Sequence, residues 1–296
     1  MTLRALLALC RIPNVFTAIA NVAAGVLLAR GGTFAMRDGL LLAASGCLYL
    51  AGMVLNDFFD RDVDALERPE RPIPAGLVSP MAALALGVAL MATGILLAAM
   101  FSSTAAAVAA GLACAILLYD GGVKTGPIGP LAMGACRFVN VCLGLTAVGT
   151  PAPPEAWMWI APLTMGAYTA AITYLSRDEV GGSSGTRARG GVLRVAAVLM
   201  AALVALATAS PASHLAGFLW LLPFALFVAL RARTVFGPLL AEASGAAIGR
   251  AIGGGILLMP AIDAAMVAAA GWPESALVVM AMALPAWMLK RRFYMT

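Results

Sequence analysis

Long stretches without any charged side chain dominate this sequence and limit what it can fold into. The longest, residues 72–119, contains 48 residues and no Asp, Glu, Lys or Arg. Because about 20 apolar helical residues cross the core of a bilayer, this stretch is long enough for two crossings, and the tripeptide SST at residues 102–104 predicts a tight turn between them. Only 11% of the residues are charged, against about a quarter in a soluble domain. The sequence therefore predicts a helical membrane protein.

Counting the apolar stretches gives the expected architecture. We expect an all-α, polytopic membrane bundle of nine to ten transmembrane helices around a central cavity, formed by a single domain over residues 1–296. The last candidate is the weakest, because it is short and contains Pro285. The ten candidate helices are residues 12–30, 39–56, 80–101, 104–119, 129–148, 156–175, 192–209, 213–230, 246–270 and 275–289.

The distribution of basic residues predicts the orientation of these helices. Lys and Arg concentrate in the cytoplasmic loops of membrane proteins, and with the first residues inside, 16 of the 19 basic residues fall on the cytoplasmic side of ten helices. We therefore expect a multi-pass integral protein, of the bacterial inner membrane, with its active site facing the cytoplasm. The net charge of +5 is explained by these loops and by anionic headgroups, so we expect membrane lipid, and no nucleic acid, as a partner.

The sequence NDFFDRDVD, which begins at Asn56, puts four carboxylates where the second predicted helix leaves the membrane. Asn56, Asp60 and Asp64 recur at every fourth residue, so a helix that continues past the membrane presents them on one face, about 6 Å apart along its axis. Mg²⁺ is commonly held by one or two carboxylates together with phosphate oxygens of a substrate. Arg68 and Arg71 follow, and guanidinium groups have the shape that binds phosphate. Acids for a metal and bases for phosphate together indicate a metal-bridged diphosphate.

The longer segment NDFFDRDVDALERPERPIPAG resembles the first aspartate-rich signature of the UbiA-type intramembrane prenyltransferases, N-D-x-x-D-x-x-x-D followed by R-P-x-R-P-[IL]-x-x-G. The resemblance extends in layout over about residues 10–230, and this loop is its most diagnostic part. It implies that the Asn and the three Asp residues bind Mg²⁺ and that both Arg residues contact substrate. The matching residues are Asn56, Asp57, Asp60, Asp64, Arg68, Pro69, Arg71, Pro72, Ile73 and Gly76.

Two further segments resemble the family less closely. Tyr119 and Lys124 match the short loop after the fourth helix, where the resemblance implies that Lys124 contacts diphosphate. The segment MGACRFVNVCLG is similar to one in the EboC-type branch, and within it Arg137 and Asn140 share a helix face and are candidates for binding substrate. Asp263, inside the ninth helix, could orient an acceptor, accept a proton or neutralise Arg137, and the pairing with Arg137 is the favoured interpretation.

The loop after the sixth predicted helix departs from the family pattern. The second signature is D-x-x-x-D after an aromatic residue and an Arg; Tyr174, Arg177 and Asp178 match it, but Gly182 stands where the second acid is expected. Glu179 is adjacent to Asp178, and adjacent helical residues point about 100° apart. Either the second metal ion has fewer protein ligands, or Glu179 replaces the missing acid at an unwound helix end, or catalysis is weakened or lost.

The resemblance implies a Mg²⁺-dependent prenyltransferase that moves an isoprenoid group from an allylic prenyl diphosphate to a hydrophobic acceptor. In order of preference, the acceptor is expected to be an aromatic or quinone precursor, a porphyrin-type alcohol or a phosphorylated polyol. A degenerate relative that binds isoprenoids or lipids, or transports them, is the alternative. The expected catalytic residues are Asp60, Asp64, Asp178 and Lys124; the expected substrate-binding residues are Asn56, Arg68, Arg71, Tyr119, Arg137, Asn140, Tyr174 and Arg177; the expected metal ligands are Asn56, Asp57, Asp60, Asp64, Asp178 and Glu179.

Overall fold

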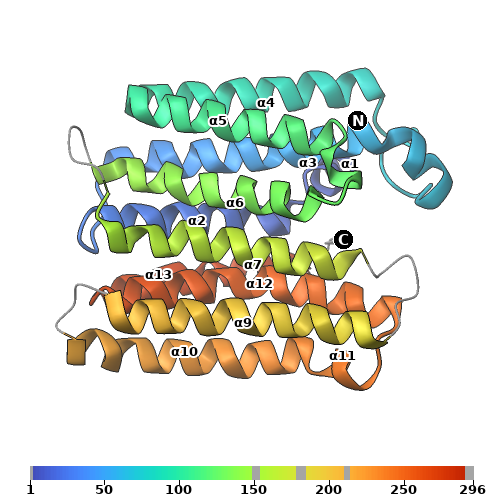
Figure 1. Ribbon diagram of the computed structural model, residues 1–296. Coiled ribbons are helices and arrows are strands. Elements are labelled where there is room, and N and C mark those ends of the chain that lie inside the picture. The colour runs from blue at the N-terminus through green and yellow to red at the C-terminus, as the bar shows by residue number, and fades with distance from the viewer. Residues whose placement is uncertain (1–2, 149–153, 178–184, 210–213, 291–296) are drawn as a thin grey trace.

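The computed structural model describes residues 3–148, 154–177, 185–209 and 214–290, and within these ranges the regular secondary structure is entirely helical, as predicted. The long helices lie side by side with their axes roughly parallel (Figure 1). They are α2 (Ile12–Ala29), α3 (Gly39–Glu67), α4 (Pro80–Phe101), α5 (Ser103–Asp120), α6 (Gly129–Leu145), α7 (Ile160–Ser176), α9 (Gly185–Ala209), α10 (His214–Phe236) and α12 (Gly245–Ala269). Shorter helices are α1 (Leu3–Leu9), η1 (Met36–Asp38), η2 (Val123–Thr125), η3 (Thr146–Val148), η4 (Ala156–Trp159), α11 (Pro238–Ala241), α13 (Pro273–Ala281) and α14 (Ala283–Lys290).

The predicted spans correspond closely to these helices, with one correction. In the described part of the chain, eight helices are long and apolar enough to cross a membrane. α7, with 17 residues, falls just short of the usual span. The last candidate, expected as one helix over 275–289, forms two consecutive helices, α13 and α14, that meet at Met282. Met282 keeps helical angles (φ −65°, ψ −15°), and the interruption lies where Pro285 lacks the N–H that would bond back into the preceding turn. The protein is a multi-pass membrane bundle of about the expected size.

The predicted turn in the longest apolar stretch is confirmed at Ser102. This residue has extended backbone angles and follows α4, and its hydroxyl oxygen accepts a hydrogen bond from the backbone N–H of Ala105 at 3.0 Å. A serine at this position satisfies one of the backbone donors that the first turn of a helix leaves unpaired. A single residue therefore ends one helix and begins the next.

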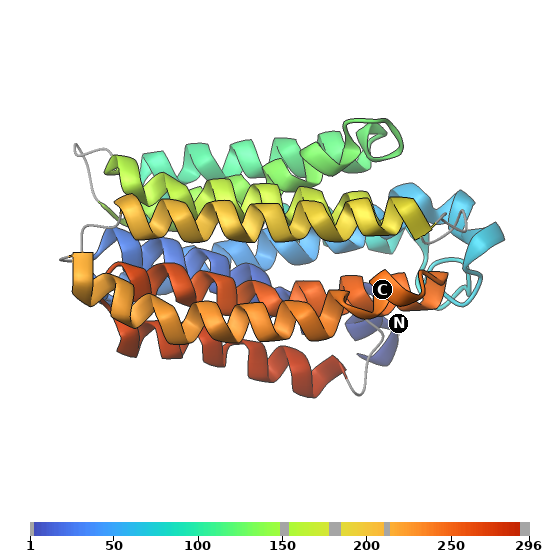
Figure 2. The same cartoon turned by 60° about the horizontal axis from the view of Figure 1, so that its bottom comes forward.

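α3 extends well past residue 56 and carries the acids of the first loop on its last turns. It ends at Glu67, because Arg68 precedes Pro69 and has non-helical angles (φ −143°, ψ 61°), as the proline ring requires of its neighbour. In both views this end of α3 lies beside the segment 68–79, at one end of the bundle (Figures 1 and 2). We call this end, where α3 ends and α12 begins, the acidic end.

Two helices form the centre of the bundle. In α2 and α12, 78% of the span is buried, whereas α4 and the spans Ala188–Ala209 and Ala216–Ala241 are only 17% buried and face the lipid. α2 packs closely on α6, where a Cβ added to Gly25 would lie 2.6 Å from the carbonyl oxygen of Val141. Close approach of this kind is typical of small residues between membrane helices. It brings the polar residues of α2 and α6 within hydrogen-bonding reach of each other.

Candidate active site

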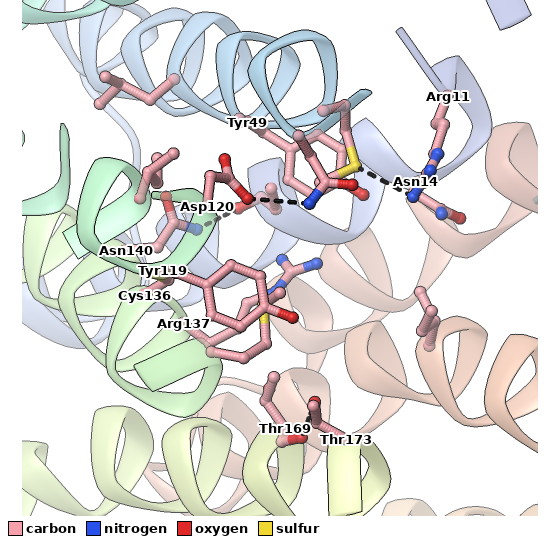
Figure 3. Close-up of a pocket in the computed structure, with 18 of the residues that line it drawn as sticks. Arg11, Asn14, Tyr49, Tyr119, Asp120, Cys136, Arg137, Asn140, Thr169 and Thr173 are labelled. Atoms are coloured by element: carbon pink, nitrogen blue, oxygen red, sulfur yellow. Dashed lines mark hydrogen bonds between the residues drawn. The ribbon is translucent and has the colours of Figure 1, made fainter. Parts of the chain in front are cut away.

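A cavity of about 260 Å³ lies among α2, α3, α5, α6, α7 and α12. Its walls are mostly aliphatic, with polar side chains contributed by the five helices other than α12, and Figure 3 shows many of these polar groups turned toward one another. A mostly apolar pocket with a few convergent polar groups is the usual form of a small-molecule site. The polar lining residues are Arg11, Asn14, Tyr49, Asn56, Tyr119, Asp120, Arg137, Asn140, Thr169, Thr173 and Ser176.

Asn56 and Asp120 meet in the wall of this cavity. Asn56 is on α3, Asp120 is the last residue of α5, and the Asn56 side-chain amide donates a hydrogen bond of 2.9 Å to Asp120 Oδ1. Asp120 is buried, and a buried carboxylate is retained at a cost unless it has a partner or a cation to bind. Asp120 is the acid of this site that the sequence did not predict. The available signal was its position, as the acid that ends the uncharged stretch directly after Tyr119.

Asp60 and Lys124 form an ion pair one helical turn further toward the acidic end. The Lys124 ammonium lies 2.6 Å from Asp60 Oδ1, and both side chains are largely buried. Lys124 is in η2, the short turn after α5, so this contact joins α3 to the loop whose lysine, by the family resemblance, is expected to contact diphosphate. The structure thus brings together the acid and the base that were assigned from two separate motifs.

The loop after α3 folds back onto the helix through Arg71. Its guanidinium lies 2.6 Å from Asp64 and 3.5 Å from Asp57, and Asp57 is also paired with Arg11 at 3.0 Å. The loop turns at Gly76, whose φ of 71° lies in the region that favours glycine, which gives a physical reason for the glycine in the motif. Asp57 and Asp64 therefore contact arginines. They do not line the cavity.

Arg68, Tyr174 and Arg177 lie outside the cavity lining. Arg177 donates hydrogen bonds to the backbone carbonyls of Lys124, at 3.3 Å, and of Gly126, so it holds the loop that carries the lysine. The Tyr174 ring lies under the guanidinium groups of Arg177 and Arg194, at 5.8 and 5.4 Å. Asp178 and Glu179 fall outside the described residues, and their predicted metal contacts stay predictions.

The expected pairing of Arg137 with Asp263 is present, but it runs through Asn21 and is not a direct contact. Arg137 donates to Asn21 Oδ1 at 2.9 Å, and the amide of Asn21 donates in turn to Asp263 Oδ2 at 2.6 Å. An asparagine of α2 thus separates the charges, because α2 lies between α6 and α12 in this part of the bundle.

Asn140 lines the cavity, and its side chain also connects neighbouring helices. Its amide oxygen accepts a hydrogen bond from the Ser45 hydroxyl at 2.8 Å, and its amide N–H donates to the Ala18 carbonyl at 2.9 Å.

The oxygen donors at the acidic end fit a hard divalent cation. Among the residues that the structure describes, no three or more His, Cys, Asp or Glu side chains are grouped as a complete metal site. Mg²⁺ does not require one, since it is often bound by one or two carboxylates with the remaining positions filled by water and substrate phosphate. Asn56, Asp60 and Asp120 supply hard oxygens of this kind, and Lys124 lies beside them.

Comparison with known proteins identifies the family. The model of the UbiA prenyltransferase family matches residues 18–247. The digeranylgeranylglyceryl phosphate synthase of Halobacterium salinarum is 33% identical over 231 residues, which cover 72% of this chain and 79% of that protein. The synthase of the same name from Methanopyrus kandleri is 29% identical over 221 residues, covering 73% and 80%.

Solved structures share the fold at lower sequence identity. The apo UbiA homologue of Aeropyrum pernix has a TM-score of 0.66 at 21% identity, over 84% of this chain and 96% of that chain. A UbiA homologue of Archaeoglobus fulgidus bound to GPP and Mg²⁺ has a TM-score of 0.54 at 13% identity, over 94% and 99%. The helical bundle, the first aspartate-rich loop and the match over most of the chain agree. This chain belongs to the UbiA prenyltransferase family and is a membrane prenyltransferase.

Proposed function

We propose that this prenyltransferase moves an isoprenoid group from an allylic prenyl diphosphate to the hydroxyl of a glycerol phosphate acceptor, with Mg²⁺ as cofactor. The observation that carries the proposal is the meeting of Asn56 and Asp60 with Asp120 and Lys124 beside an apolar cavity. The name of the archaeal relatives supports a glycerol phosphate acceptor, and this replaces the aromatic or quinone precursor as our preferred acceptor. The assignment to the EboC-type branch stays a prediction.

In the proposed reaction Asn56, Asp60 and Asp120 would hold the metal. When bound, Mg²⁺ would neutralise the charge that develops on the diphosphate as the allylic C–O bond breaks. Asp64 remains a predicted ligand, since a diphosphate that draws Arg71 away would free its carboxylate. The Asp178 and Glu179 side of the site remains a prediction as well.

The chain's own residues would do the rest of the work. Lys124 and Arg71 stabilise the leaving diphosphate electrostatically. The aliphatic walls of the cavity, which include Leu48, Leu112 and Ile172, exclude water from the carbocation until the acceptor hydroxyl attacks it. The proton of that hydroxyl would pass to the released diphosphate. The orientation with this site toward the cytoplasm is supported by the Lys and Arg distribution along the sequence.

Transfer can be tested with purified protein in nanodiscs. Radiolabelled allylic diphosphates of several chain lengths would be supplied with Mg²⁺ and one acceptor at a time: a prenylated glycerol phosphate, an aromatic carboxylic acid or a porphyrin-type alcohol. We expect label in the glycerol phosphate product and its loss when EDTA removes the metal. Label only in the aromatic product would refute the acceptor assignment. Turnover that survives EDTA would refute the requirement for Mg²⁺.

Arg177 is expected to act through the Lys124 loop. Because it binds the carbonyls of Lys124 and Gly126, Arg177→Ala should displace the ammonium from the diphosphate and lower kcat/KM for the donor about 10- to 100-fold, since small misplacements of catalytic groups have effects of this size. Arg189→Ala is the matched control, because Arg189 donates to the Leu240 carbonyl at 3.4 Å in a similar exposed contact. Equal losses in both variants would show that the effect is structural.

A further inference from the structure

Arg137 differs from Arg11, the other basic side chain that lines the cavity, and from Arg71 and Lys124 beside it. Arg11, Arg71 and Lys124 are each paired with a carboxylate. In the described structure, the contacts of the Arg137 guanidinium are with neutral groups: Asn21 at 2.9 Å, Thr17 at 3.1 Å and the face of the Tyr49 ring at 5.3 Å.

The arrangement fixes a positive charge in the cavity wall. Arg137 is only 9% exposed and lines the cavity, where a charge is costly. Asp263 compensates this charge in part, but it acts through Asn21 and does not touch the guanidinium. Its partners are themselves held: the Thr17 hydroxyl donates to the Asn14 carbonyl at 2.7 Å, which leaves its lone pairs for the guanidinium. The amide of Asn21 is oriented by Asp263 at 2.6 Å. A buried cation that is rigidly positioned and directly bound only to neutral groups is suited to an anionic ligand.

A second unpaired polar group lines the same cavity. Thr169, on α7, is 4% exposed, and its hydroxyl has no hydrogen-bond partner among the described residues. It is one of the side chains that surround the cavity together with Arg137 (Figure 3). A buried hydroxyl left without a partner has a free-energy cost, and an oxyanion in the cavity would accept its hydrogen bond.

The depth of Arg137 separates this anion from the metal-bound diphosphate. Tyr49, on which Arg137 stacks, precedes Asn56 by seven residues on α3, which corresponds to about 10 Å along the helix axis. Asp60, which pairs with Lys124, follows Asn56 by four residues, so it lies about 6 Å from Asn56 along the same axis, on the side away from Tyr49. An anion at Arg137 is therefore on the far side of the reaction centre from the predicted diphosphate contacts.

We propose that Arg137 and Thr169 form a subsite for the phosphate of the acceptor, and that Asp263 is a positioning residue that acts through Asn21. The proposal rests on the proposed function, in which the acceptor is a glycerol phosphate. Its phosphate binds deep in the cavity, and its hydroxyl faces the allylic carbon. Selection of the acceptor then depends on a charge that the donor does not contact.

The test separates acceptor binding from donor binding. Arg137→Gln is expected to raise KM for a prenylated glycerol phosphate about 10- to 100-fold and Thr169→Val about 10-fold, because hydrogen bonds to a charged group are lost. KM for the allylic diphosphate should stay within about threefold. Arg231→Gln and Thr164→Val, outside the cavity lining, are the controls. A rise in KM for the donor in place of the acceptor would overturn the proposal, as would unchanged KM for both.

The positioning role of Asp263 has its own signature. Asp263→Leu should raise KM for the acceptor with little change in KM for the donor. Asp263→Asn should keep KM for the acceptor close to the wild-type value, because an amide oxygen still accepts the hydrogen bond from Asn21. Equal effects of both substitutions on both substrates would contradict this role.

Equilibrium binding keeps the inference independent of turnover. Binding of the prenylated glycerol phosphate to the full-length protein in nanodiscs, without donor, should weaken in Arg137→Gln and be largely retained in Arg137→Lys. Wild-type protein that binds this acceptor but transfers nothing to it would refute the proposed function and leave the subsite standing. Wild-type transfer with unchanged binding in Arg137→Gln would refute the subsite alone.

Discussion

Asp60→Asn is expected to lower kcat/KM for prenyl transfer by about 10²- to 10³-fold, the usual effect of removing one group that stabilises a developing charge. Asp60 is a proposed ligand of Mg²⁺ and already contacts Lys124 at 2.6 Å. Loss of this carboxylate would weaken the binding of Mg²⁺ and would also change the position of the Lys124 side chain. The measurement is transfer of radiolabel in nanodiscs at saturating Mg²⁺ and again over a Mg²⁺ titration, where the variant should need more metal.

The matched control for this substitution is Asp62→Asn. Asp62 is two residues away in the same acidic sequence, but its side chain is 85% exposed and contacts Arg61 at 3.5 Å. Both substitutions remove one negative charge from the acidic end, so a general electrostatic effect would appear in both. An Asp60→Asn variant that is as active as Asp62→Asn would contradict the role of Asp60 as a metal ligand.

Asp120→Asn is expected to have a second large effect, a loss of about 10²-fold in kcat. The substitution retains an oxygen that can accept the 2.9 Å hydrogen bond from Asn56, so it removes the charge and keeps the packing. Transfer rates and the thermal unfolding midpoint would be compared with those of the wild type. A large loss of activity with a nearly unchanged midpoint is the expected combination.

A double-mutant cycle would show whether Asn56 and Asp120 act together. If both hold one metal ion, Asn56→Ala and Asp120→Asn should be strongly non-additive in their effects on kcat, because groups that act as a unit fail together. Independent, additive effects, or full activity in Asp120→Asn, would contradict the role assigned to Asp120.

Much of the fold could be predicted because membrane helices are encoded locally. An uncharged stretch of sufficient length is a helix in lipid whatever its neighbours are, and the turn at Ser102 is visible from three polar residues between two apolar runs. The division of the last span between α13 and α14 was not predicted, because whether a helix continues toward a proline depends on its packing partners.

The site could be predicted only where the chemistry lies within one motif. The acids of the first loop follow a recognisable spacing, whereas Asp120 is a single acid that also serves as the end of a helix. Its contact with Asn56 spans 64 residues, and the Asn21 contact with Asp263 spans 242. Asn21 resembled any other polar residue of an apolar helix, and only the packing of α2 between α6 and α12 gives it a role.

Direct observation of metal binding tests the central claim most simply. Mn²⁺ would replace Mg²⁺, and electron paramagnetic resonance would report free Mn²⁺ in the presence of nanodisc-embedded protein and inorganic pyrophosphate, with empty nanodiscs as the blank. The wild type should bind Mn²⁺ more tightly when pyrophosphate is present, and both Asp60→Asn and Asp120→Asn should weaken that binding by at least about 10-fold. Binding that is equally tight in the wild type and in both variants would contradict a metal-bridged diphosphate at this site.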